Sequence, residues 1–399
     1  MSSAVPEGWQ ISSIEDLLTP NCLFSDGDWV ESKDQDPAGT NRLLQLADIG
    51  DGRFVNKSNR FMNDEQFNRL NCTQLQEGDV LIARMPEPIG RACILPRLDN
   101  RLATVVDIAI LRPSAVDSYW LMSVINSAGF RTKIEEQSSG TTRTRIGRTA
   151  LSKIKLLSPP LPEQKKIASI LTSVDEVIEN TQKQIDKLQD LKKATMNELL
   201  TKGIGHTEFK DSELGRIPKS WEVSSLGECF NLTSGKSKPK RLLSSVKTQL
   251  SKVPVYGGNG VTGYTDSELL DEQTIVIGRV GEYCGCVHLT PKLCWITDNA
   301  LYIKSITRVF DLSFMFHLMV FSDLAQLQSK GGQPLVSQKP ISEFVIALPP
   351  IVEQQKIASF IDAISSNIDN QSVKLSQTQS LKKSLMQDLL TGKVRVTVN

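Results

Sequence analysis

The chain has almost no net charge. Its 46 lysine and arginine residues are matched by 45 aspartate and glutamate residues, which leaves a formal charge of +1. A protein that binds nucleic acid by charge alone carries a clear basic excess, so the composition argues against a simple basic binder. Basic residues are uneven locally: residues 236–252 contain six and no acidic residue, and residues 131–155 contain seven against two. Such runs are more often solvated surface than binding faces.

Long apolar runs are also missing. A membrane span needs about 20 apolar residues, and the richest stretch, residues 310–321, contains Asp311 and His317. The first residues, Met-Ser-Ser-Ala-Val-Pro, lack the basic and apolar blocks of a signal peptide. Seven cysteines, an odd number thinly spread, are typical of free thiols in a reducing compartment. We therefore expect a cytoplasmic protein.

Catalytic and metal-binding motifs are scarce. There is no G-x-S-x-G, no H-E-x-x-H and no Asn-Pro-Pro-aromatic motif of adenine methyltransferases. Cys284, Cys286 and His288 alternate as on one face of a strand, near Cys294. Zinc prefers ligands that converge from turns, so a buried apolar face is favoured over a metal site. The G-x-G-x-x-G at residues 258–263 precedes another strand-like run, which predicts a hairpin rather than a dinucleotide site. We expect no catalytic residue, metal or cofactor in this chain.

The chain does contain a long internal repeat. A shift of 190 residues aligns residues 159–203 with 349–393 without a gap, and 18 of the 45 positions are identical. Identities cluster in Glu-Gln-x-Lys-Ile-Ala-Ser and in Leu-Lys-Lys-x-x-Met-x-x-Leu-Leu-Thr. Residues 6–14, which contain Gly-Trp, are similarly matched by residues 218–226, which contain Ser-Trp. Because the repeat covers both kinds of segment, we expect one architectural unit used twice.

Each copy of the repeat predicts a long helix. Pro159, Pro160 and Pro162 fit only just before a helix or in its first turn. Residues 163–201 contain neither proline nor glycine, and Gly203 supplies a stop signal. At 1.5 Å per residue, roughly 39 residues make a rod of about 58 Å.

Apolar residues in both copies follow the alternating three and four spacing of a coiled-coil seam. The expected seam consists of Leu171, Val174, Ile178, Ile185, Leu188 and Leu199 in the first copy, and of Ile361, Ile364, Ile368, Leu375, Leu385 and Leu389 in the second. The two helices are expected to pair with each other, antiparallel, because the first leaves one domain and the second returns from the next. The alternative is that each helix packs on its own neighbouring domain.

The remaining segments predict two mixed domains. Short apolar or alternating runs at residues 43–49, 79–84, 104–111 and 151–157 in the first half, and at 274–280 and 300–304 in the second, are typical of strands, and residues 253–264 predict a turn-rich hairpin. Residues 119–126 and 314–328 predict helices. The expected fold is α+β: two domains of similar mixed α/β fold, separated by two long antiparallel helices in a pseudo-twofold repeat. The expected boundaries are 1–158 and 206–348 for the domains, 159–205 for the first helix and linker, and 349–399 for the second helix and C-terminal tail.

These motifs resemble a known family. Pro-Pro-Leu-Pro-Glu-Gln-Lys-Lys-Ile at residues 159–167, its copy at 349–357, the Leu-Lys-Lys ends and Ile-Pro-Lys-Ser-Trp at 217–221 together resemble the specificity subunit of type I restriction-modification systems. The resemblance spans nearly the whole chain. It implies a non-catalytic subunit that recognises a split, asymmetric sequence in double-stranded DNA and directs adenine-N6 methylation and DNA cleavage by its partners.

The resemblance also implies partner subunits and their cofactors. The methyltransferase (modification) subunits would use S-adenosylmethionine, and the restriction (endonuclease and translocase) subunits would use ATP and Mg²⁺. A second hypothesis is a helical protein-protein scaffold that touches DNA only indirectly. A DNA-binding assay with and without methyltransferase separates the two, because a scaffold would show no sequence preference even in the complex.

Residues that contact DNA are expected in loops near strand ends. Arginine can bond guanine and asparagine or glutamine can bond adenine in a bidentate way, whereas lysine grips phosphates. The candidates are Arg84, Arg91, Arg143, Arg145, Lys236, Lys238, Asn259, Arg279 and Gln333. The Gly-Gly-Gln-Pro loop at 331–334 matches the usual form of the family, whereas Thr-Thr-Arg-Thr at 141–144 departs from it.

Overall fold

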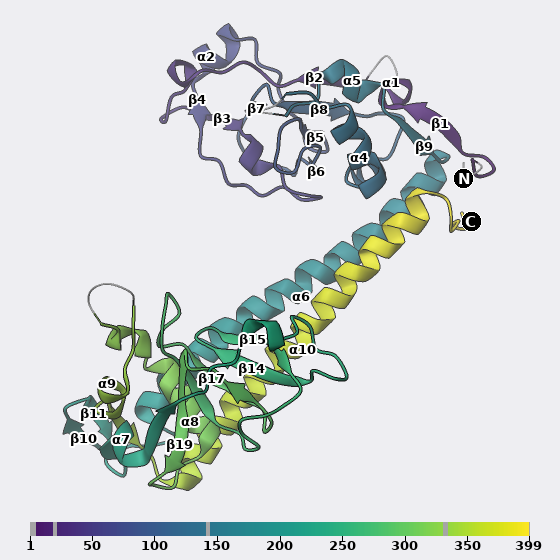
Figure 1. Ribbon diagram of the computed structural model, residues 1–399. Coiled ribbons are helices and arrows are strands. Elements are labelled where there is room, and N and C mark those ends of the chain that lie inside the picture. The colour runs from purple at the N-terminus through teal and green to yellow at the C-terminus, as the bar shows by residue number, and fades with distance from the viewer. Residues whose placement is uncertain (1–4, 19–21, 141–143, 330–333, 399) are drawn as a thin grey trace. The chain divides into compact units, whose positions relative to one another are not determined.

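The computed structural model describes residues 5–18, 22–140, 144–329 and 334–398 (Figure 1). The chain divides into two compact units. The first comprises Met1–Thr181 and Lys374–Asn399, and the second comprises Gln182–Val373. The two units cut across both long helices, so each contains part of both, and the expected boundaries between domains and helices stay a prediction. No helix in the described ranges is both long and apolar enough to cross a membrane.

The first unit contains two small sheets and a separate strand pair. One sheet has the antiparallel order β2-β8-β5-β6, and the other has the order β4-β3-β7, in which β3 and β7 are parallel. Strands β1 and β9 form the pair that leads into the first long helix. The strands are β1 (Gln10–Ser13), β2 (Leu23–Asp26), β3 (Asn41–Leu44), β4 (Phe61–Met62), β5 (Val80–Ala83), β6 (Ala92–Ile94), β7 (Leu102–Thr104), β8 (Ile108–Arg112) and β9 (Lys155–Ser158).

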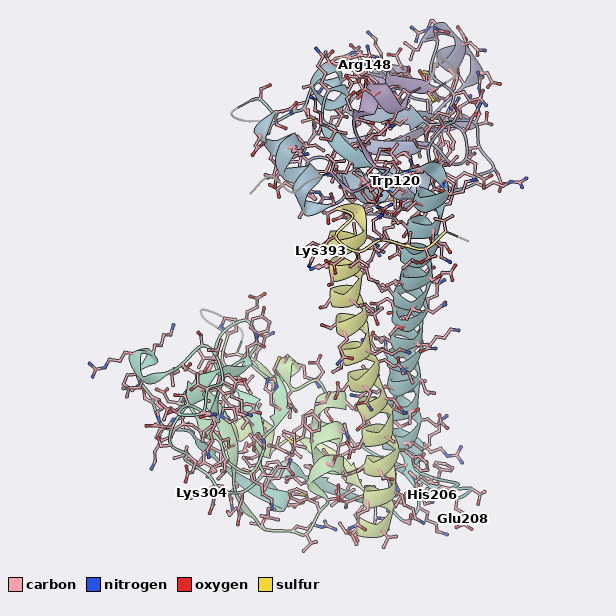
Figure 2. The ribbon with its side chains drawn as sticks, turned by 90° about the vertical axis from the view of Figure 1, so that its right-hand side faces the viewer. Trp120, Arg148, His206, Glu208, Lys304 and Lys393 are labelled. Carbon is pink, nitrogen blue, oxygen red and sulfur yellow. The ribbon has the colours of Figure 1, made fainter. Side chains whose placement is uncertain are left out.

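Short helices pack around the sheets of the first unit. They are α1 (Ile14–Leu17), α2 (Asp64–Arg69), α3 (Ser118–Ile125), α4 (Ala128–Glu136) and α5 (Arg148–Ser152), with 3₁₀ turns η1 (Ser32–Asp34) and η2 (Leu46–Asp48). Trp120 of α3 is fully buried (Figure 2) and belongs to the core that strands β5 and β8 share with the long helices. Three expectations need correction: residues 46–48 leave the strand as a 3₁₀ turn, residues 105–107 separate β7 from β8 instead of continuing one strand, and residues 148–152 form α5 ahead of β9.

The second unit repeats this plan. Its sheets have the orders β13-β19-β16-β17 and β15-β14-β18, again with one parallel pair, β14 and β18, and β12 pairs with β20 as β1 does with β9. The strands are β10 (Phe209–Ser212), β11 (Gly215–Pro218), β12 (Glu222–Ser225), β13 (Phe230–Ser234), β14 (Val253–Gly257), β15 (Gly260–Thr265), β16 (Ile275–Gly278), β17 (Val287–Leu289), β18 (Trp295–Ile296), β19 (Ala300–Ile306) and β20 (Val345–Leu348). The β10-β11 hairpin, joined by a tight turn, follows the first long helix.

The short helices of the second unit correspond to α1, α3 and α5 of the first. They are α7 (Leu226–Cys229), α8 (Leu312–Phe321) and α9 (Gln338–Ser342), with 3₁₀ turns η3 (Lys240–Leu242) and η4 (Leu324–Leu327). The expected helix over residues 314–328 is thus α8 followed by a separate 3₁₀ turn. Asp323, with a positive φ of 47°, breaks the helix between them. The expected G-x-G-x-x-G hairpin is confirmed, because Gly257 pairs with Gly260 across the β14-β15 turn.

The two long helices are α6 (Leu161–Lys202) and α10 (Ile351–Leu390), of 42 and 40 residues. They run antiparallel within each unit. In the first unit Asp175 lies 2.5 Å from Lys382, and Glu163 lies 2.8 Å from Arg395. All twelve expected seam residues are buried or half-buried, whereas most neighbouring helix positions are exposed. The expected seam residues therefore lie on the buried faces of the two helices.

The repeated Glu-Gln pair joins the start of each long helix to its own unit. Gln164 accepts a hydrogen bond from the Asp117 amide (3.0 Å) and donates one to the Pro159 carbonyl (2.8 Å). Gln354 does the same with the Asp311 amide (2.8 Å) and the Pro349 carbonyl (2.8 Å). Because each glutamine is almost fully buried and both of its polar ends are paired, the motif has a structural role.

The glutamate of each Glu-Gln pair accepts a hydrogen bond from a tryptophan side chain that also belongs to the repeat. Glu163 accepts from Trp9 Nε1 (3.0 Å), and Glu353 accepts from Trp221 Nε1 (3.1 Å). Glu353 also accepts from the Ile204 amide (3.0 Å) just after α6 ends. The sequence matches around the tryptophans and the Glu-Gln pairs are therefore partners in one contact, made once in each unit.

Candidate nucleic-acid interface

Four loops of the second unit meet where β13, β14 and β16 end and β19 begins. We call residues 234–236, 258–259, 279–280 and 297–299 the second-unit edge. The main chain joins these loops: the Lys236 amide donates to the Ile296 carbonyl (2.9 Å), and the Arg279 amide donates to the Asn299 carbonyl (2.9 Å). Segments far apart in the sequence are thereby held together.

Two glycines allow this close approach. A Cβ atom on Gly235 would lie 2.3 Å from the Ile296 carbonyl oxygen, and one on Gly278 would lie 2.1 Å from the Gly258 carbonyl oxygen. Both contacts are with backbone, which cannot move aside as a flexible side chain could. The loops of the second-unit edge are therefore set by main-chain packing, and their side chains are free to vary.

The polar side chains of the second-unit edge differ in how available they are to a ligand. Lys236 and Asn259 are exposed, and Asn259 stands at the tip of the β14-β15 turn. Arg279 is half-buried, and its Nη1 donates to Ser234 Oγ (3.2 Å). Lys236 and Asn259 are thus available to a ligand, while Arg279 is partly committed to holding the edge.

Lys238 is held beside this edge by an aromatic ring. Its Nζ lies 3.8 Å from the centroid of the Trp295 ring and donates to Ser267 Oγ (2.8 Å). The indole Nε1 of Trp295 in turn donates to the Lys236 carbonyl (2.9 Å). Trp295 therefore fixes both the course of the loop after β13 and the position of the Lys238 ammonium group.

The first unit has an edge with the same framework. We call residues 26–28, 84, 105–107 and 145 the first-unit edge. Gly27 approaches the Val105 carbonyl as Gly235 approaches that of Ile296, since a Cβ atom on Gly27 would lie 2.2 Å from the carbonyl oxygen. The Arg84 amide donates to the Asp107 carbonyl (2.9 Å), as Arg279 does to Asn299. Arg84 and Arg279 therefore occupy equivalent places in the two units.

The expectation that Arg84 and Arg91 contact DNA does not fit their burial. Arg84 is 2% exposed, forms an ion pair with Asp26 (2.9 Å) and donates to the carbonyl of Val106. Arg91 is 8% exposed and donates to the carbonyls of Ile49 (2.6 Å) and Leu46 (2.9 Å), among others. Burial lowers the pKa of both guanidinium groups, but arginine stays charged even so. Each is an internal support for its strand end.

The first-unit edge is acidic where the second is basic. Asp28 follows Gly27 at the place that Lys236 takes after Gly235. Together with Glu31 and Asp107 it lines a cleft of about 610 Å³. Trp29, in the wall of this cleft, is 69% exposed. Partial burial raises the pKa of Asp28, although hydrogen bonds from Thr73 act against this. The two edges thus share a backbone but differ in formal charge. The first has Asp26, Asp28 and Asp107 against Arg84 and Arg145, and the second has Lys236 and Arg279 against Asp298.

The other expected residues are placed as follows. Arg145 is partly exposed and lies 3.3 Å from Asp107 Oδ1, at the rim of the first-unit edge. Arg143 and Gln333 fall in residues 141–143 and 330–333, outside the described residues. The structure therefore brings together Lys236, Asn259 and Arg279 in one unit and Arg84 and Arg145 in the other.

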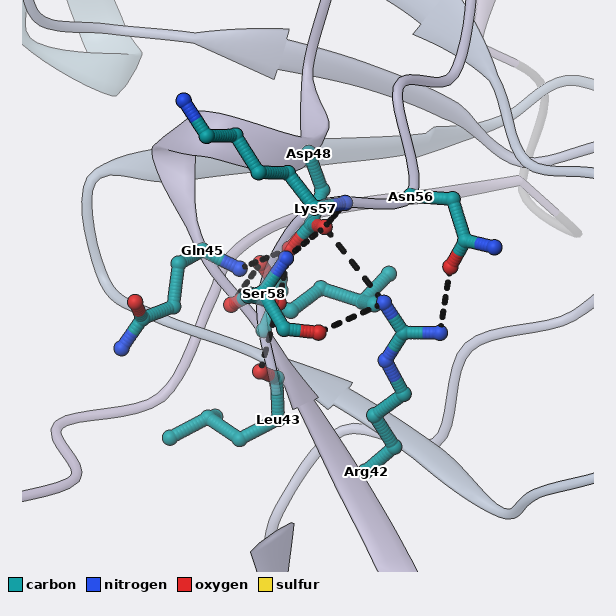
Figure 3. A network of polar contacts seen from close by, with 9 residues as sticks. Arg42, Leu43, Gln45, Asp48, Asn56, Lys57 and Ser58 are labelled. Carbon is teal, nitrogen blue, oxygen red and sulfur yellow. Dashed lines mark hydrogen bonds and ion pairs between the residues drawn. The ribbon is translucent and has the colours of Figure 1, made fainter. Parts of the chain in front are cut away.

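A buried polar network in the first unit was not anticipated from the sequence (Figure 3). Asp48 is fully buried and accepts from the amides of Gln45 (2.8 Å), Lys57 (2.7 Å) and Ser58 (2.7 Å). Arg42 approaches the same carboxylate at 3.5 Å. Fixed amide donors stabilise the charged carboxylate, so Asp48 organises the loop after β3. An Asp in an ordinary Ala-Asp-Ile sequence gave no signal of this role.

The cysteine and histidine cluster also differs from expectation. Only His288 lies in a strand, β17, while Cys284 and Cys286 lie in the turn before it, where Gly281 and Gly285 have positive φ. Within the described ranges, no group of three or more His, Cys, Asp or Glu side chains is arranged to hold a metal ion. Burial raises the pKa of Cys284 and lowers that of His288, which keeps both neutral.

Comparison with known proteins gives a consistent result. The family model described as "Type I restriction modification DNA specificity domain" matches residues 6–190 and 218–378. The putative type I restriction enzyme MjaX specificity subunit of Methanocaldococcus jannaschii is 29% identical, over 98% of this chain and 95% of that protein. The MjaVIII specificity subunit of the same organism is 28% identical, over 66% of this chain and 67% of that protein.

Solved structures share the fold. The S subunit of a type I restriction-modification system from M. genitalium matches with a TM-score of 0.66 and 17% identity, covering 100% of this chain and 98% of the other. A chain from a study of complex assembly and conformational transition in a type I system matches with a TM-score of 0.57 and 14% identity, covering 98% and 100%. At these identities the likeness concerns the fold.

Proposed function

Because this chain belongs to the family of type I restriction-modification DNA specificity subunits, we propose that its two edges read the two halves of one split, asymmetric DNA target. The family model covers parts of both units, and sequence-specific DNA recognition is the function of the family. The chain is the non-catalytic recognition subunit, and the indirect scaffold is the less favoured hypothesis.

The observation that carries this proposal is the unequal pair of edges on one framework. Equivalent glycines and equivalent main-chain hydrogen bonds place Asp28 and Lys236 at corresponding positions. An acidic side chain accepts from the amino groups of cytosine, whereas lysine donates to guanine or to phosphate. Two readers with opposite chemistry favour two different half-sites.

We extend the proposal to the partners that the family implies. Methyltransferase subunits would bring S-adenosylmethionine for adenine-N6 methylation, and restriction subunits would bring ATP and Mg²⁺ for cleavage. The expected cytoplasmic location accords with the cysteines, which form no disulfide among the described residues. The long helices are proposed to set the gap between the half-sites.

Methylation mapping tests the proposed function. DNA from a host that carries the full chain and its modification subunits is sequenced for N6-methyladenine, and a single bipartite, non-palindromic motif is expected. A chain with Asn259→Ala should keep the half-site read by the first unit and relax one position of the other. Methylation without any sequence preference would support the scaffold hypothesis.

A further inference from the structure

A lysine-rimmed pocket lies at the other end of the β14-β15 hairpin from Asn259. It measures about 570 Å³ and is lined by Lys247, Lys252, Val253, Pro254, Tyr264, Pro291, Lys292 and Leu293. All three lysines are exposed. In the described part of the chain, no carboxylate lies within salt-bridge distance of any of the three ammonium groups. The rim therefore carries three exposed ammonium groups that form no ion pair among the described residues.

A turn between two of these lysines carries an unusually exposed leucine. The Thr248 amide donates to the Ser251 carbonyl (3.1 Å), and the Ser251 amide donates to Thr248 Oγ1 (3.0 Å). These bonds close the turn and place Leu250 at its tip, where it is 85% exposed. At this exposure the side chain contributes little to the core, and it is available to a ligand.

The base of this turn is tied to the hairpin. Ser244 and Tyr264 exchange main-chain hydrogen bonds of 2.9 and 2.8 Å. Leu243 packs on Gly263, where an added Cβ atom would lie 3.2 Å from Leu243 Cβ. The turn is thus carried on a sheet rather than on a free loop, so binding would lose little conformational entropy.

The spacing along the hairpin fits duplex DNA. Five residues separate Pro254, in the pocket, from Asn259 at the turn, which is about 16 Å at roughly 3.3 Å per residue. One turn of B-DNA is about 34 Å long, so this distance is about half a turn. On one face of a duplex, points half a turn apart meet opposite grooves. A major-groove contact by Asn259 would therefore place the pocket at the minor groove.

We propose that residues 247–252 form a minor-groove wedge: Leu250 inserts between two base pairs beside the half-site, while Lys247, Lys252 and Lys292 hold the flanking phosphates. Apolar side chains that enter a base step from the minor groove unstack it and bend the duplex. The wedge explains why an exposed leucine is surrounded by lysines, because phosphates flank every base step. The inference rests on the proposed DNA-recognition function and adds a contact outside the edge that reads bases.

The first experiment places 2-aminopurine at successive positions flanking the mapped half-site in a duplex that contains the full target. The full chain, in complex with its modification subunits, should raise the fluorescence of the probe at one base step, because unstacking relieves quenching. Leu250→Ala should abolish that rise and leave the sequence preference unchanged. Val309→Ala, which alters another highly exposed side chain (78%) of the second unit, is the matched control and should behave as the unaltered chain does.

The second experiment measures the salt dependence of binding. Replacing Lys247, Lys252 and Lys292 by glutamine should lower the slope of log K against log salt by about 2.7, since each phosphate contact contributes about 0.9. Lys210→Gln and Lys304→Gln change exposed lysines elsewhere in the unit (Figure 2 labels Lys304) and should leave the slope unchanged. Because all three lysines are exposed and glutamine keeps the inner methylene groups of the side chain, folding should be retained.

Three outcomes overturn the wedge. If the unaltered chain binds its target but no probe brightens, or if Leu250→Ala leaves the brightening intact, Leu250 does not enter the duplex. If Leu250→Ala instead weakens assembly with the modification subunits while DNA distortion persists, the turn is a protein interface. Absence of any sequence-specific binding by the unaltered chain would refute the proposed function itself, and the two failures are thereby distinguished.

Discussion

Gln354→Ala should loosen the start of α8 without disturbing the equivalent helix in the first unit. Gln354 is 1% exposed. Its Oε1 accepts from the Asp311 amide and its Nε2 donates to the Pro349 carbonyl, both at 2.8 Å. Asp311 is the N-cap of α8, and its own side chain accepts from the Phe314 amide. The glutamine thus couples the first turn of α10 to the cap of α8.

The expected cost follows from two buried groups left without partners. Each unsatisfied buried donor or acceptor costs about 1–3 kcal/mol. Removal of the Gln354 side chain leaves the Asp311 amide and the Pro349 carbonyl without hydrogen-bond partners. Water that enters the space left behind can bond to these groups and recover part of the lost free energy. We therefore expect the local opening free energy at the start of α8 to fall by about 2–4 kcal/mol.

Hydrogen exchange measures this effect locally. With 1.4 kcal/mol per factor of ten, amide exchange in residues 309–318 should accelerate by roughly 30-fold to 1,000-fold. Gln164→Ala is the matched control, because Gln164 makes the same two bonds with Asp117 and Pro159. It should accelerate exchange around residue 117 and leave residues 309–318 as they were.

Gln354→Glu adds a pH test. A carboxylate can still accept from the Asp311 amide, but only the protonated acid can donate to the Pro349 carbonyl. Burial and that carbonyl should raise the pKa of the introduced carboxyl above its unfolded value of about 4.3. The folded state then binds the proton more tightly, so stability is retained below about pH 4.3 and declines as the pH rises through the folded pKa. Equal exchange in Gln354→Ala and the unaltered chain, or a pH-independent Gln354→Glu, would refute the reasoning.

Four further predictions concern DNA and the framework. Lys236→Gln should lower the salt slope of DNA binding by about 0.9. Asn259→Ala should weaken the binding free energy by about 1–3 kcal/mol and relax the preference at one base pair, as measured by titration against single-base variants of the target. Arg84→Ala should lower the free energy of unfolding of the first unit by about 2–3 kcal/mol in denaturant unfolding. This is less than the loss of one partner of a fully buried ion pair would cost, because Asp26 is partly exposed. A changed salt slope of DNA binding would contradict the structural role of Arg84. Inserting seven residues near the middle of both α6 and α10 keeps the seam and lengthens each helix by about 10.5 Å. Methylation mapping should then show unchanged half-sites separated by a gap about three base pairs longer. A new half-site at the old gap would be evidence against the spacer role of the helices.

The difference between Arg84 and Arg279 shows why residue roles were hard to predict. Both follow a buried strand and occupy the same place in the framework. Asp26 faces the first and Ser234 faces the second, so one arginine is locked in an ion pair and the other is held by a single hydroxyl. These partners are 58 and 45 residues away in sequence, and no local pattern reports them.

Sequence alone determined the repeat, the two long helices with their seam, and the family, because these depend on periodicity, proline and glycine placement, and motifs that lie within single segments. Only the tertiary structure decided which loops share an edge, that Arg84 and Arg91 are internal supports, and that Leu250 stands exposed among lysines. The physical reason is that exposure and charge pairing are properties of side chains brought together across sheets. In this chain, loops separated by tens of residues pack backbone against backbone, and that packing leaves Lys236 and Asn259 facing solvent.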